Sequence, residues 1–376
     1  MLSMKTLLML AMAACAVFAI LLILFQIFVK NKKVKHTTML VLNRLFGFLF
    51  LTAVIVGIAA LGAGYIATRE EYPNTRETVV MTMEETRRFR FVPRIFLTQT
   101  ETDEIMARRD ATMDEVMDPT LIHVAAQDPQ SETADPSQPS TPKTDNYGLV
   151  DEDGDGYILV PVSGRGFNGY MLIVLDPTRC FVAKGGNGQT INLIAQRTGA
   201  IGGINGGAFR DEKGGGTGEY PEGLTIIDGQ MIEAARWGQE SFAGFDSQGI
   251  LHVGYFTYAD CLDMDIVGGV SFSPPLIING VPQDTSYIPS GVNPRTAIGQ
   301  RADGAVLMLV INGRQLSSAG ATYDDVIDVM LQFGAVNAMN LDGGSSTVMY
   351  LNGELVNTPS SESGYSRGLP DAFMFR

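Results

Sequence analysis

Residues that bind transition metals or act as nucleophiles are scarce in this chain. Its 376 residues include 3 His and 3 Cys, too few for a zinc finger or a disulfide scaffold. Charged residues make up only 18% and hydrophobic residues 45%, which excludes a chain that is disordered throughout. The length therefore indicates one or two domains with substantial hydrophobic cores.

Positive charge is missing from most of the sequence. The chain carries 27 Lys and Arg against 41 Asp and Glu, a net charge of -14. Residues 1–68 hold six of the basic residues and no acid, so the remainder carries 21 basic and 41 acidic residues. Because such an acidic body repels phosphate backbones, nucleic acid is not an expected partner.

Two long hydrophobic runs occupy the N-terminal region, at residues 6–29 and 45–67. Each is long enough as a helix to cross a hydrocarbon core of about 30 Å. The segment between them, KNKKVKHTTMLVLNR, has five basic residues and no acid, as cytoplasmic loops do. We therefore expect a two-span transmembrane hairpin over residues 1–68. The rest of the chain is then an ectodomain on the extracytoplasmic side of the cell membrane.

A cleaved signal peptide over residues 1–25 is the alternative. The apolar run continues well beyond the small residues Ala11–Ala14, which is not typical of a signal peptide. Cleavage at Cys15, as in a lipoprotein, would leave Ala16–Leu24 as an exposed apolar tail. The hairpin is favoured because the span lengths and the loop charge both support it.

Composition divides the remaining chain into three parts. Residues 69–126 are charged and amphipathic, and this juxtamembrane region contains predicted helices at Thr98–Asp110 and Glu84–Arg88. Residues 127–146 are rich in Pro, Ser, Thr and acid, which predicts a flexible spacer. The folded domain is expected over residues 147–376.

Short β-rich runs separated by turn signals dominate this domain, and four Asn-Gly or Asp-Gly pairs favour two-residue hairpins. The pairs are Asp228-Gly229, Asn279-Gly280, Asn312-Gly313 and Asn352-Gly353. One helix is predicted to begin at Thr190 and run toward Gly199. Another begins at Thr322, with Asp325 as its capping partner, and ends at Gly334. The fold class is therefore α+β, a sheet-rich globular ectodomain with a few helices, preceded by the transmembrane hairpin.

Three segments of the domain contain candidate binding residues. In Gly202–Phe209, glycines flank Asn205 and allow backbone amides to approach a ligand, although a structural bulge is favoured on this segment alone. Asp211–Gly223 has the composition of a mobile acidic loop, in which Glu222 either contacts substrate or is simply solvated. Arg295 follows a proline and has a donor fork suited to an anion, with a structural ion pair as the alternative.

The most distinctive segment is NLDGGSST, residues 340–347, where an acid, two glycines and three hydroxyls lie within eight residues. That composition is typical of a sugar or phosphate site. It does not fit a Gly-x-Ser-x-Gly nucleophile elbow. A Ser-His-Asp triad would need His252 or His123, and we disfavour it because a general base must lie within hydrogen-bond reach.

No cofactor and no metal site are predicted. The sequence DEDGDG, residues 151–156, resembles the start of a calcium loop, but Val162 stands where a bidentate Glu is needed. A polar surface turn is therefore expected there, and a structural Ca²⁺ remains the alternative. Cys180 and Cys261 both lie in the predicted ectodomain, and their spacing does not decide whether they form a disulfide.

Taken together, GGINGGAF, NPRTAIG and NLDGGSSTVMYLNG, in that order, resemble the phosphodiester glycosidase family over roughly Asp151–Arg376. This family includes an enzyme that removes N-acetylglucosamine from a phosphodiester on mannose 6-phosphate. Similar bacterial members with a membrane hairpin and a Pro/Ser-rich spacer are often labelled exopolysaccharide biosynthesis proteins. The sequence departs from the common Asp-Gly-Gly-Gly-Ser pattern by having Ser345 where a third glycine is frequent.

The resemblance implies a hydrolase that cleaves a sugar-1-phosphodiester in an envelope glycan or exopolysaccharide. Asp342 would lie nearest the anomeric carbon, Arg295 would bind the phosphate, and Asn205 would border the sugar. The other expected substrate-binding residues are Gly206, Gly207, Glu222, Thr296, Gly343, Gly344, Ser345 and Ser346.

Two other functions stay open. A non-catalytic protein on the same fold would bind glycans or organise polymer assembly at the membrane, since fold does not determine function. A cytoplasmic signalling domain would require the opposite membrane topology.

Overall fold

The computed structural model describes residues 36–69, 71, 76, 79–80, 92–102, 104–105, 116–124, 143–210, 217–235, 238–285, 288, 291–361 and 366–376. The chain divides into two compact units. The first comprises residues 1–112 with 287–289, and the second comprises residues 113–286 with 290–376.

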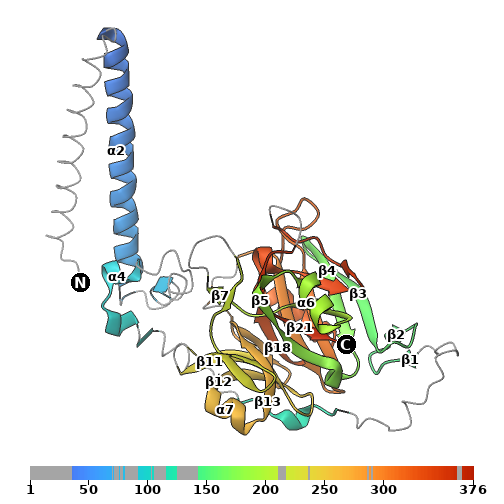
Figure 1. Ribbon diagram of the computed structural model, residues 1–376. Coiled ribbons are helices and arrows are strands. Elements are labelled where there is room, and N and C mark those ends of the chain that lie inside the picture. The colour runs from blue at the N-terminus through green and yellow to red at the C-terminus, as the bar shows by residue number, and fades with distance from the viewer. Residues whose placement is uncertain are drawn as a thin grey trace. The chain divides into compact units, whose positions relative to one another are not determined.

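The first unit contains one long apolar helix, α2, His36–Ala67 (Figure 1). Its segment Phe50–Ala67 has a mean hydropathy of 2.1 and is the candidate membrane span among the described residues. The predicted second span therefore lies within α2, but the helix begins earlier than expected and includes residues 36–44 of the predicted loop. The other predicted span, residues 6–29, lies outside the described residues, so the hairpin stays a prediction.

A short segment after α2 packs against it. The ring of Phe96, at the end of helix α4, Pro93–Phe96, would lie 2.7 Å from a Cβ on Gly64, so the glycine makes room for the ring. Thr98 then caps the next turn, because its hydroxyl accepts from the Glu101 N–H at 3.2 Å. Residues 99–102 and 104–105 are helical, in agreement with the predicted start at Thr98. The rest of that helix and the one predicted at Glu84–Arg88 lie outside the described residues.

The second unit is built from three antiparallel sheets (Figure 1). The largest has the order β15-β14-β18-β16-β17-β4-β3, the second β20-β19-β6-β21-β5, and the third β10-β9-β13-β11-β12. Two further strand pairs, β1-β2 and β7-β8, are separate. The sheet-rich α+β class is thus confirmed.

The strands have the following bounds: β1 Lys143–Thr144, β2 Val150–Asp151, β3 Tyr157–Gly164, β4 Phe167–Val174, β5 Cys180–Gln189, β6 Gly202–Asn205, β7 Phe209–Arg210, β8 Tyr220–Pro221, β9 Thr225–Ile227, β10 Gln230–Glu233, β11 Gln239–Asp246, β12 Leu251–Thr257, β13 Ile266–Ser271, β14 Pro275–Ile278, β15 Val281–Pro282, β16 Arg295–Arg301, β17 Val306–Ile311, β18 Ala335–Leu341, β19 Met349–Leu351, β20 Glu354–Leu355 and β21 Leu369–Phe375. The helices are α6 Ile191–Thr198, α7 Tyr258–Asp263 and α8 Tyr323–Gln332, with short 3₁₀ turns η2 Pro119–Leu121, η4 Pro177–Arg179 and η5 Gly344–Ser346.

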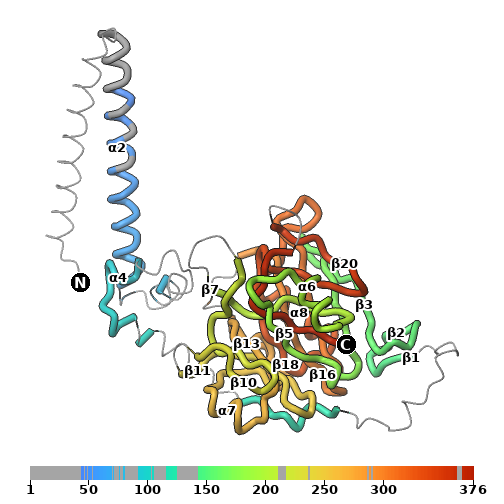
Figure 2. Tube along the Cα trace, in the orientation of Figure 1, coloured from blue at the N-terminus to red at the C-terminus, as the bar shows by residue number. Residues whose placement is uncertain are grey.

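One hydrophobic core joins the three sheets. Its fully buried side chains include Met308 and Leu341 from the largest sheet, Phe373 from the second and Phe245 from the third. Helices α6, α7 and α8 pack against the second, third and largest sheets respectively (Figure 2). Burial of apolar side chains contributes about 25 cal/mol per Å², so this shared core is what holds the sheets together.

Both predicted helices of this domain are confirmed at their ends. Thr190 is the N-cap of α6, and Gly199 ends the helix in the left-handed region with φ of 69°. Thr322 and Asp325 form the predicted capping box at the start of α8. Gly334, with φ of 80°, follows the last turn of that helix.

Three of the four predicted hairpin turns are confirmed, between β9 and β10, β14 and β15, and β19 and β20. The prediction at Asn312-Gly313 is wrong, because β17 is followed there by a loop that leads to α8. The Asn312 amide donates to Asn168 Oδ1 at 2.7 Å, and a Cβ on Gly313 would lie 2.6 Å from the Pro294 nitrogen. Tertiary contacts therefore explain this Asn-Gly pair.

The two described cysteines are free thiols. Cys180 begins β5 and Cys261 lies in α7, and the two side chains belong to different hydrophobic clusters. Burial raises the pKa of the Cys261 thiol to about 12. Both thiols therefore act as small apolar side chains here.

Candidate active site

The three sequence motifs meet where strands of two sheets end. In the largest sheet, Thr296 of β16 pairs with Leu341 of β18, so that NPRT and NLDGG lie side by side. The Asp342 N–H then donates to the carbonyl of Gly206, just after β6 in the second sheet, at 3.1 Å. Segments more than 130 residues apart in the sequence thus form one site.

Asn205 links these strand ends. Its Nδ2 donates to the Asp342 carbonyl at 2.7 Å, and its Oδ1 accepts from the Thr296 hydroxyl at 2.9 Å. The same Oδ1 also accepts from the Val348 N–H at 3.1 Å. With only 1% of its surface exposed, Asn205 holds the three motifs together through its side chain.

The two residues after Asn205 must be glycines because they pack against the buried carboxylate of Asp371, which was not among the predicted site residues. The Gly207 N–H donates to Asp371 Oδ1 at 2.7 Å. A Cβ on Gly206 would lie 2.2 Å from the same oxygen, so any larger residue there would displace it. Gly206 and Gly207, predicted to contact substrate, therefore lie directly over Asp371.

Asp371 has no exposed surface, and its Oδ2 has no hydrogen-bond partner among the described residues. Burial raises the pKa of this carboxyl to about 7; the Gly207 hydrogen bond lowers it, and the charge of Asp342 raises it further. Asp371 thus exchanges a proton near neutral pH beside a second carboxylate. The available sequence signal was a lone acid within the apolar strand LPDAFMF.

The Asp342-Gly343-Gly344 turn is also shaped by close packing. A Cβ on Gly343 would lie 2.7 Å from the carbonyl oxygen of Pro294, whereas Gly344 has φ of 62° and donates its N–H to that same oxygen at 3.0 Å. Two glycines are therefore needed to turn the chain immediately after Asp342. The Asp342 residue itself is partly exposed.

The hydroxyls that follow this turn have different surroundings. Ser345 is partly exposed, and its Oγ accepts from Arg367 Nη1 at 3.0 Å. The hydroxyls of Ser346 and Thr347 are buried and have no partner within the described part of the chain. Because a buried hydroxyl normally has a hydrogen-bond partner, these groups are suited to form hydrogen bonds with water or with ligand oxygens.

Arg295 lies at the start of β16 and is buried. Its Nε donates to the Ala321 carbonyl at 3.0 Å and its Nη2 to the Gly291 carbonyl at 2.7 Å. The guanidinium carbon also lies 4.1 Å from the centroid of the Tyr323 ring. The predicted phosphate ligand therefore uses part of its donor fork to hold the surrounding backbone.

Glu222 lies beside the glycine-rich segment through its backbone, whose N–H donates to the Ala208 carbonyl at 2.9 Å. Much of the predicted acidic loop, residues 211–216, lies outside the described residues. Glu240, not identified from the sequence, accepts from the Leu224 N–H at 2.7 Å in the same region.

Residues that suggested other chemistry have structural contacts. His252 lies on β12, and its Nε2 is 2.9 Å from Asp246 Oδ2. Although burial raises the pKa of Asp246, hydrogen bonds from His252 and the Ile250 N–H hold it below its ordinary value. Asp151 accepts from the N–H groups of Gly154 and Gly156, as a polar turn would. No group of three or more potential metal ligands occurs among the described residues.

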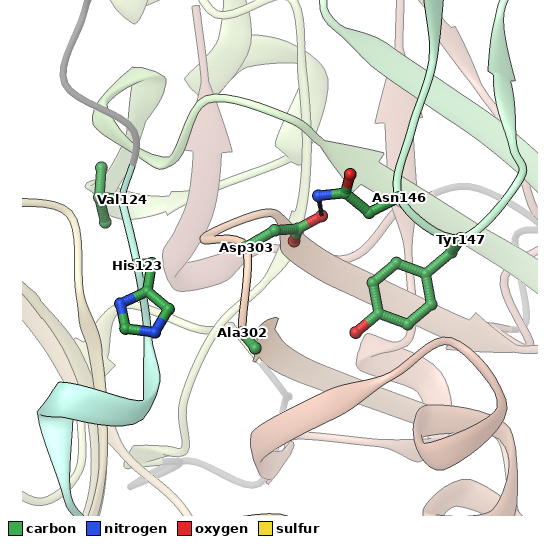
Figure 3. A pocket seen from close by; sticks show the side chains of 6 residues that line it. All are labelled: His123, Val124, Asn146, Tyr147, Ala302 and Asp303. Carbon is green, nitrogen blue, oxygen red and sulfur yellow. Dashed lines mark hydrogen bonds between the residues drawn. The ribbon is translucent and has the colours of Figure 1, made fainter.

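A cavity of about 610 Å³ lies at the opposite end of β16 (Figure 3). It is lined by His123, Val124, Asn146, Tyr147, Ala302 and Asp303. The Asp303 carboxylate in its wall already pairs with Arg301 at 2.7 Å. Asn205, Arg295 and Asp342 do not line this cavity, so it does not belong to the candidate active site.

Comparisons with known proteins find similarity over the C-terminal half of this chain. Residues 198–376 match the family model described as phosphodiester glycosidase. A mouse N-acetylglucosamine-1-phosphodiester alpha-N-acetylglucosaminidase is 29% identical over 227 residues, 52% of this chain and 42% of that protein. The SPbeta prophage-derived uncharacterized protein YomE of Bacillus subtilis (strain 168) is 31% identical over 212 residues, 52% of this chain and 31% of that protein.

A solved structure is also similar. The zebrafish N-acetylglucosamine-1-phosphodiester alpha-N-acetylglucosaminidase catalytic domain, auto-inhibited by its pro-peptide, is 23% identical with a TM-score of 0.49. The similarity covers 58% of this chain and 82% of that one. The chain spans less than half the length of the two curated relatives described above.

Proposed function

We propose that the protein hydrolyses a sugar-1-phosphodiester, because residues 198–376 match the phosphodiester glycosidase family model. The proposed substrate is a glycan or glycosyl-phosphate polymer of the cell envelope, such as an exopolysaccharide. Asp342 is the proposed catalytic carboxylate.

The observation that carries this proposal is the position of Asp342. Its N–H donates to the Gly206 carbonyl and its carbonyl accepts from the Asn205 amide, so the Gly202–Phe209 motif fixes its backbone. The charge of the Asp342 carboxylate raises the pKa of the buried Asp371. Hydroxyl side chains follow Asp342 along the chain. A carboxylate held this way, beside a second carboxyl of very different surroundings, matches the needs of glycosyl transfer to water.

The proposed reaction breaks the bond between the anomeric carbon and the phosphate oxygen, and the electron pair of that bond leaves with the phosphate. Positive charge that develops at the sugar is stabilised by the Asp342 carboxylate. Water adds to the anomeric carbon and loses one proton, which gives a free sugar and a phosphomonoester. Because phosphate is a good leaving group, the reaction depends more on charge stabilisation than on a strong general acid.

Membrane anchoring is a further part of the proposal. The hydropathy of Phe50–Ala67 supports one span, and the basic loop preceding it supports a cytoplasmic location for that loop. With a second span at residues 6–29, the catalytic domain would be held outside the cytoplasm near polymers of the envelope.

The test uses the full-length protein in detergent with a synthetic N-acetylglucosamine-1-phosphodiester, and follows free sugar. We expect release by the unmodified protein and by Asp228→Asn, and none above background with Asp342→Asn. Asp228 is a matched control, because it is an exposed acid in the turn after β9 with φ of 51°, which Asn tolerates.

Release that persists unchanged in Asp342→Asn would contradict the assigned catalytic residue. If a panel of glycosyl phosphodiesters all stay intact while envelope polymers bind, the protein is a glycan-binding or assembly protein instead. Full protection of the domain from protease added to intact cells would contradict the extracytoplasmic location.

A further inference from the structure

Arg367 has a guanidinium that is held in place and has no carboxylate partner among the described residues. Its Nη1 donates to Ser345 Oγ at 3.0 Å, and its guanidinium carbon lies 4.4 Å from the centroid of the Phe209 ring. Its Nε is buried and has no partner within the described ranges. Stacking therefore orients the planar fork while several of its donors remain available for an anion.

A second arginine reaches the same loop from the segment after β17. Arg314 Nη2 lies 3.4 Å from the position of a Cβ on Gly344, so the guanidinium is next to the backbone of that glycine. The same Nη2 donates to Asn293 Oδ1 at 3.1 Å. Arg314 has φ of 58°, a left-handed conformation that is rare for a residue with a Cβ and is often found at functional sites.

Among the described residues, these two arginines have no carboxylate partner. Neither guanidinium lies within ion-pair distance of a carboxylate in the part of the chain that the structure describes. By contrast, Arg210 pairs with Glu233 and Arg301 with two aspartates. In a chain with 41 acidic residues, two arginines that contact one glycine-serine turn and have no carboxylate partner among the described residues indicate a site for an anionic ligand.

We propose that Arg367 and Arg314 bind the phosphate group of the substrate over the Gly344-Ser345 turn. This assignment rests on the proposed function and replaces Arg295 as the principal phosphate ligand. The guanidinium groups bind the monoanionic diester and stabilise the charge that collects on the departing phosphate oxygen. The buried Ser346 hydroxyl, which has no partner among the described residues, follows directly in the sequence and is a further candidate donor.

Arg295 has a different role in this scheme. Because it donates to the carbonyls of Ala321 and Gly291, its loss leaves those acceptors unsatisfied and destabilises the loop before β16. We therefore expect Arg295→Gln to lower the melting temperature, and Arg367→Gln to weaken anion binding with little change in melting temperature.

The experiment measures binding of inorganic phosphate to the full-length protein in detergent by isothermal titration calorimetry. We expect Arg367→Gln and Arg314→Gln each to weaken binding about 10-fold, as loss of a charge-assisted hydrogen bond would. Arg367→Lys should recover part of the loss, because the charge returns without the planar fork. Arg197→Gln removes the same charge from the exposed end of α6 and should not change binding.

Phosphate binding does not require turnover, so the phosphate site and the proposed reaction can fail separately. Wild-type protein that does not bind phosphate would overturn this phosphate site even if sugar release is observed. Unchanged binding in folded Arg367→Gln and Arg314→Gln would also overturn it, as would a loss of binding confined to folded Arg295→Gln. Binding with the expected losses but no sugar release would contradict the hydrolase and retain the anion site.

Discussion

Arginines near the opposite ends of strand β16 differ in how their charges are paired. At the end of the strand, Arg301 has no exposed surface and donates to Asp145 and to Asp303, each at 2.7 Å. Its guanidinium also lies 4.1 Å from the centroid of the Tyr147 ring. Burial alone would raise the pKa of Asp145, but hydrogen bonds from Arg301 and the Leu149 N–H hold it below its ordinary value.

Near the start of the strand, arginines and hydroxyls lack some of their partners among the described residues. Arg314 and Arg367 have no carboxylate partner among the described residues, and Ser346 and Thr347 have buried hydroxyls without acceptors or donors there. A fully paired cluster thus stabilises the fold, whereas polar groups without partners in a rigid frame are available to bind a ligand.

The largest effect should come from Asp342→Asn, near the start of β16. We expect sugar release from the synthetic phosphodiester to fall by about 10²–10⁴-fold, the range for loss of a positioned catalytic group. Ligand binding should persist, because Asn keeps the size of the side chain. Turnover and calorimetric binding measured on the same preparation check this, and equal losses in binding and turnover would contradict a role in the transition state.

At the other end of β16, a substitution of Arg301 should change stability instead. Arg301→Met leaves the Asp145 side chain, 4% exposed, and the Asp303 side chain, 20% exposed, without their cation, which should lower the free energy of unfolding by about 3–5 kcal/mol. Urea denaturation of the full-length protein measures the change. Arg165→Met, at an exposed position in the turn after β3, is the control and should change stability by no more than about 0.5 kcal/mol. Equal stability of the two variants would contradict the comparison.

Asp371→Asn should change how stability depends on pH. The folded-state pKa of about 7 exceeds the ordinary value of 3.8, so between these values the folded state binds more protons than the unfolded state. The contribution of Asp371 is therefore fully present below 3.8 and is lost as pH rises through about 7. Asn keeps an acceptor for the Gly207 N–H and does not titrate.

The stability of Asp371→Asn relative to wild type should therefore increase as pH rises from about 4 to about 7, and then remain constant. Denaturation series at several pH values on both proteins check this trend. A difference that does not change with pH would show that Asp371 is not buried as a neutral acid in solution.

The smallest stability effect is expected for Ser346→Ala. Its buried hydroxyl has no partner among the described residues, so its removal should change the free energy of unfolding by at most about 0.5 kcal/mol while weakening phosphate binding. Thr322→Ala should show the opposite pattern. It removes the N-cap of α8, which should lower the free energy of unfolding by about 1 kcal/mol, and it should leave phosphate binding unchanged. A stability loss for Ser346→Ala similar to that of Thr322→Ala would contradict this contrast.

Local sequence signals predicted the elements that depend on local interactions. The capping box at Thr322 and the left-handed Gly199 were predicted because each involves residues within one turn of helix. The same logic failed at Asn312-Gly313, where packing on Pro294 outweighs the turn preference of the pair. The motifs containing Asn205 and Asp342 were noted from residue type, and the family resemblance implied that they belong to one site.

Asp371, Arg367 and Arg314 were missed because their importance arises from distant neighbours. The pKa of Asp371 is raised because β21 buries the carboxyl against Gly206 and Gly207. Arg314 and Arg367 are 53 positions apart, and each reaches the Gly344-Ser345 turn only in the folded domain.

The sequence by itself determined the apolar segment of α2, the sheet-rich class, the helix caps and the three motifs, because hydrophobic pattern and backbone preference are local properties. Only the tertiary structure decided which polar groups are paired and which are available. Arg295 is bound to backbone carbonyls, whereas Arg367 is not paired with a described carboxylate. That distinction depends on burial and on partners brought together by strand pairing, and the free energy of a charge is determined by those surroundings.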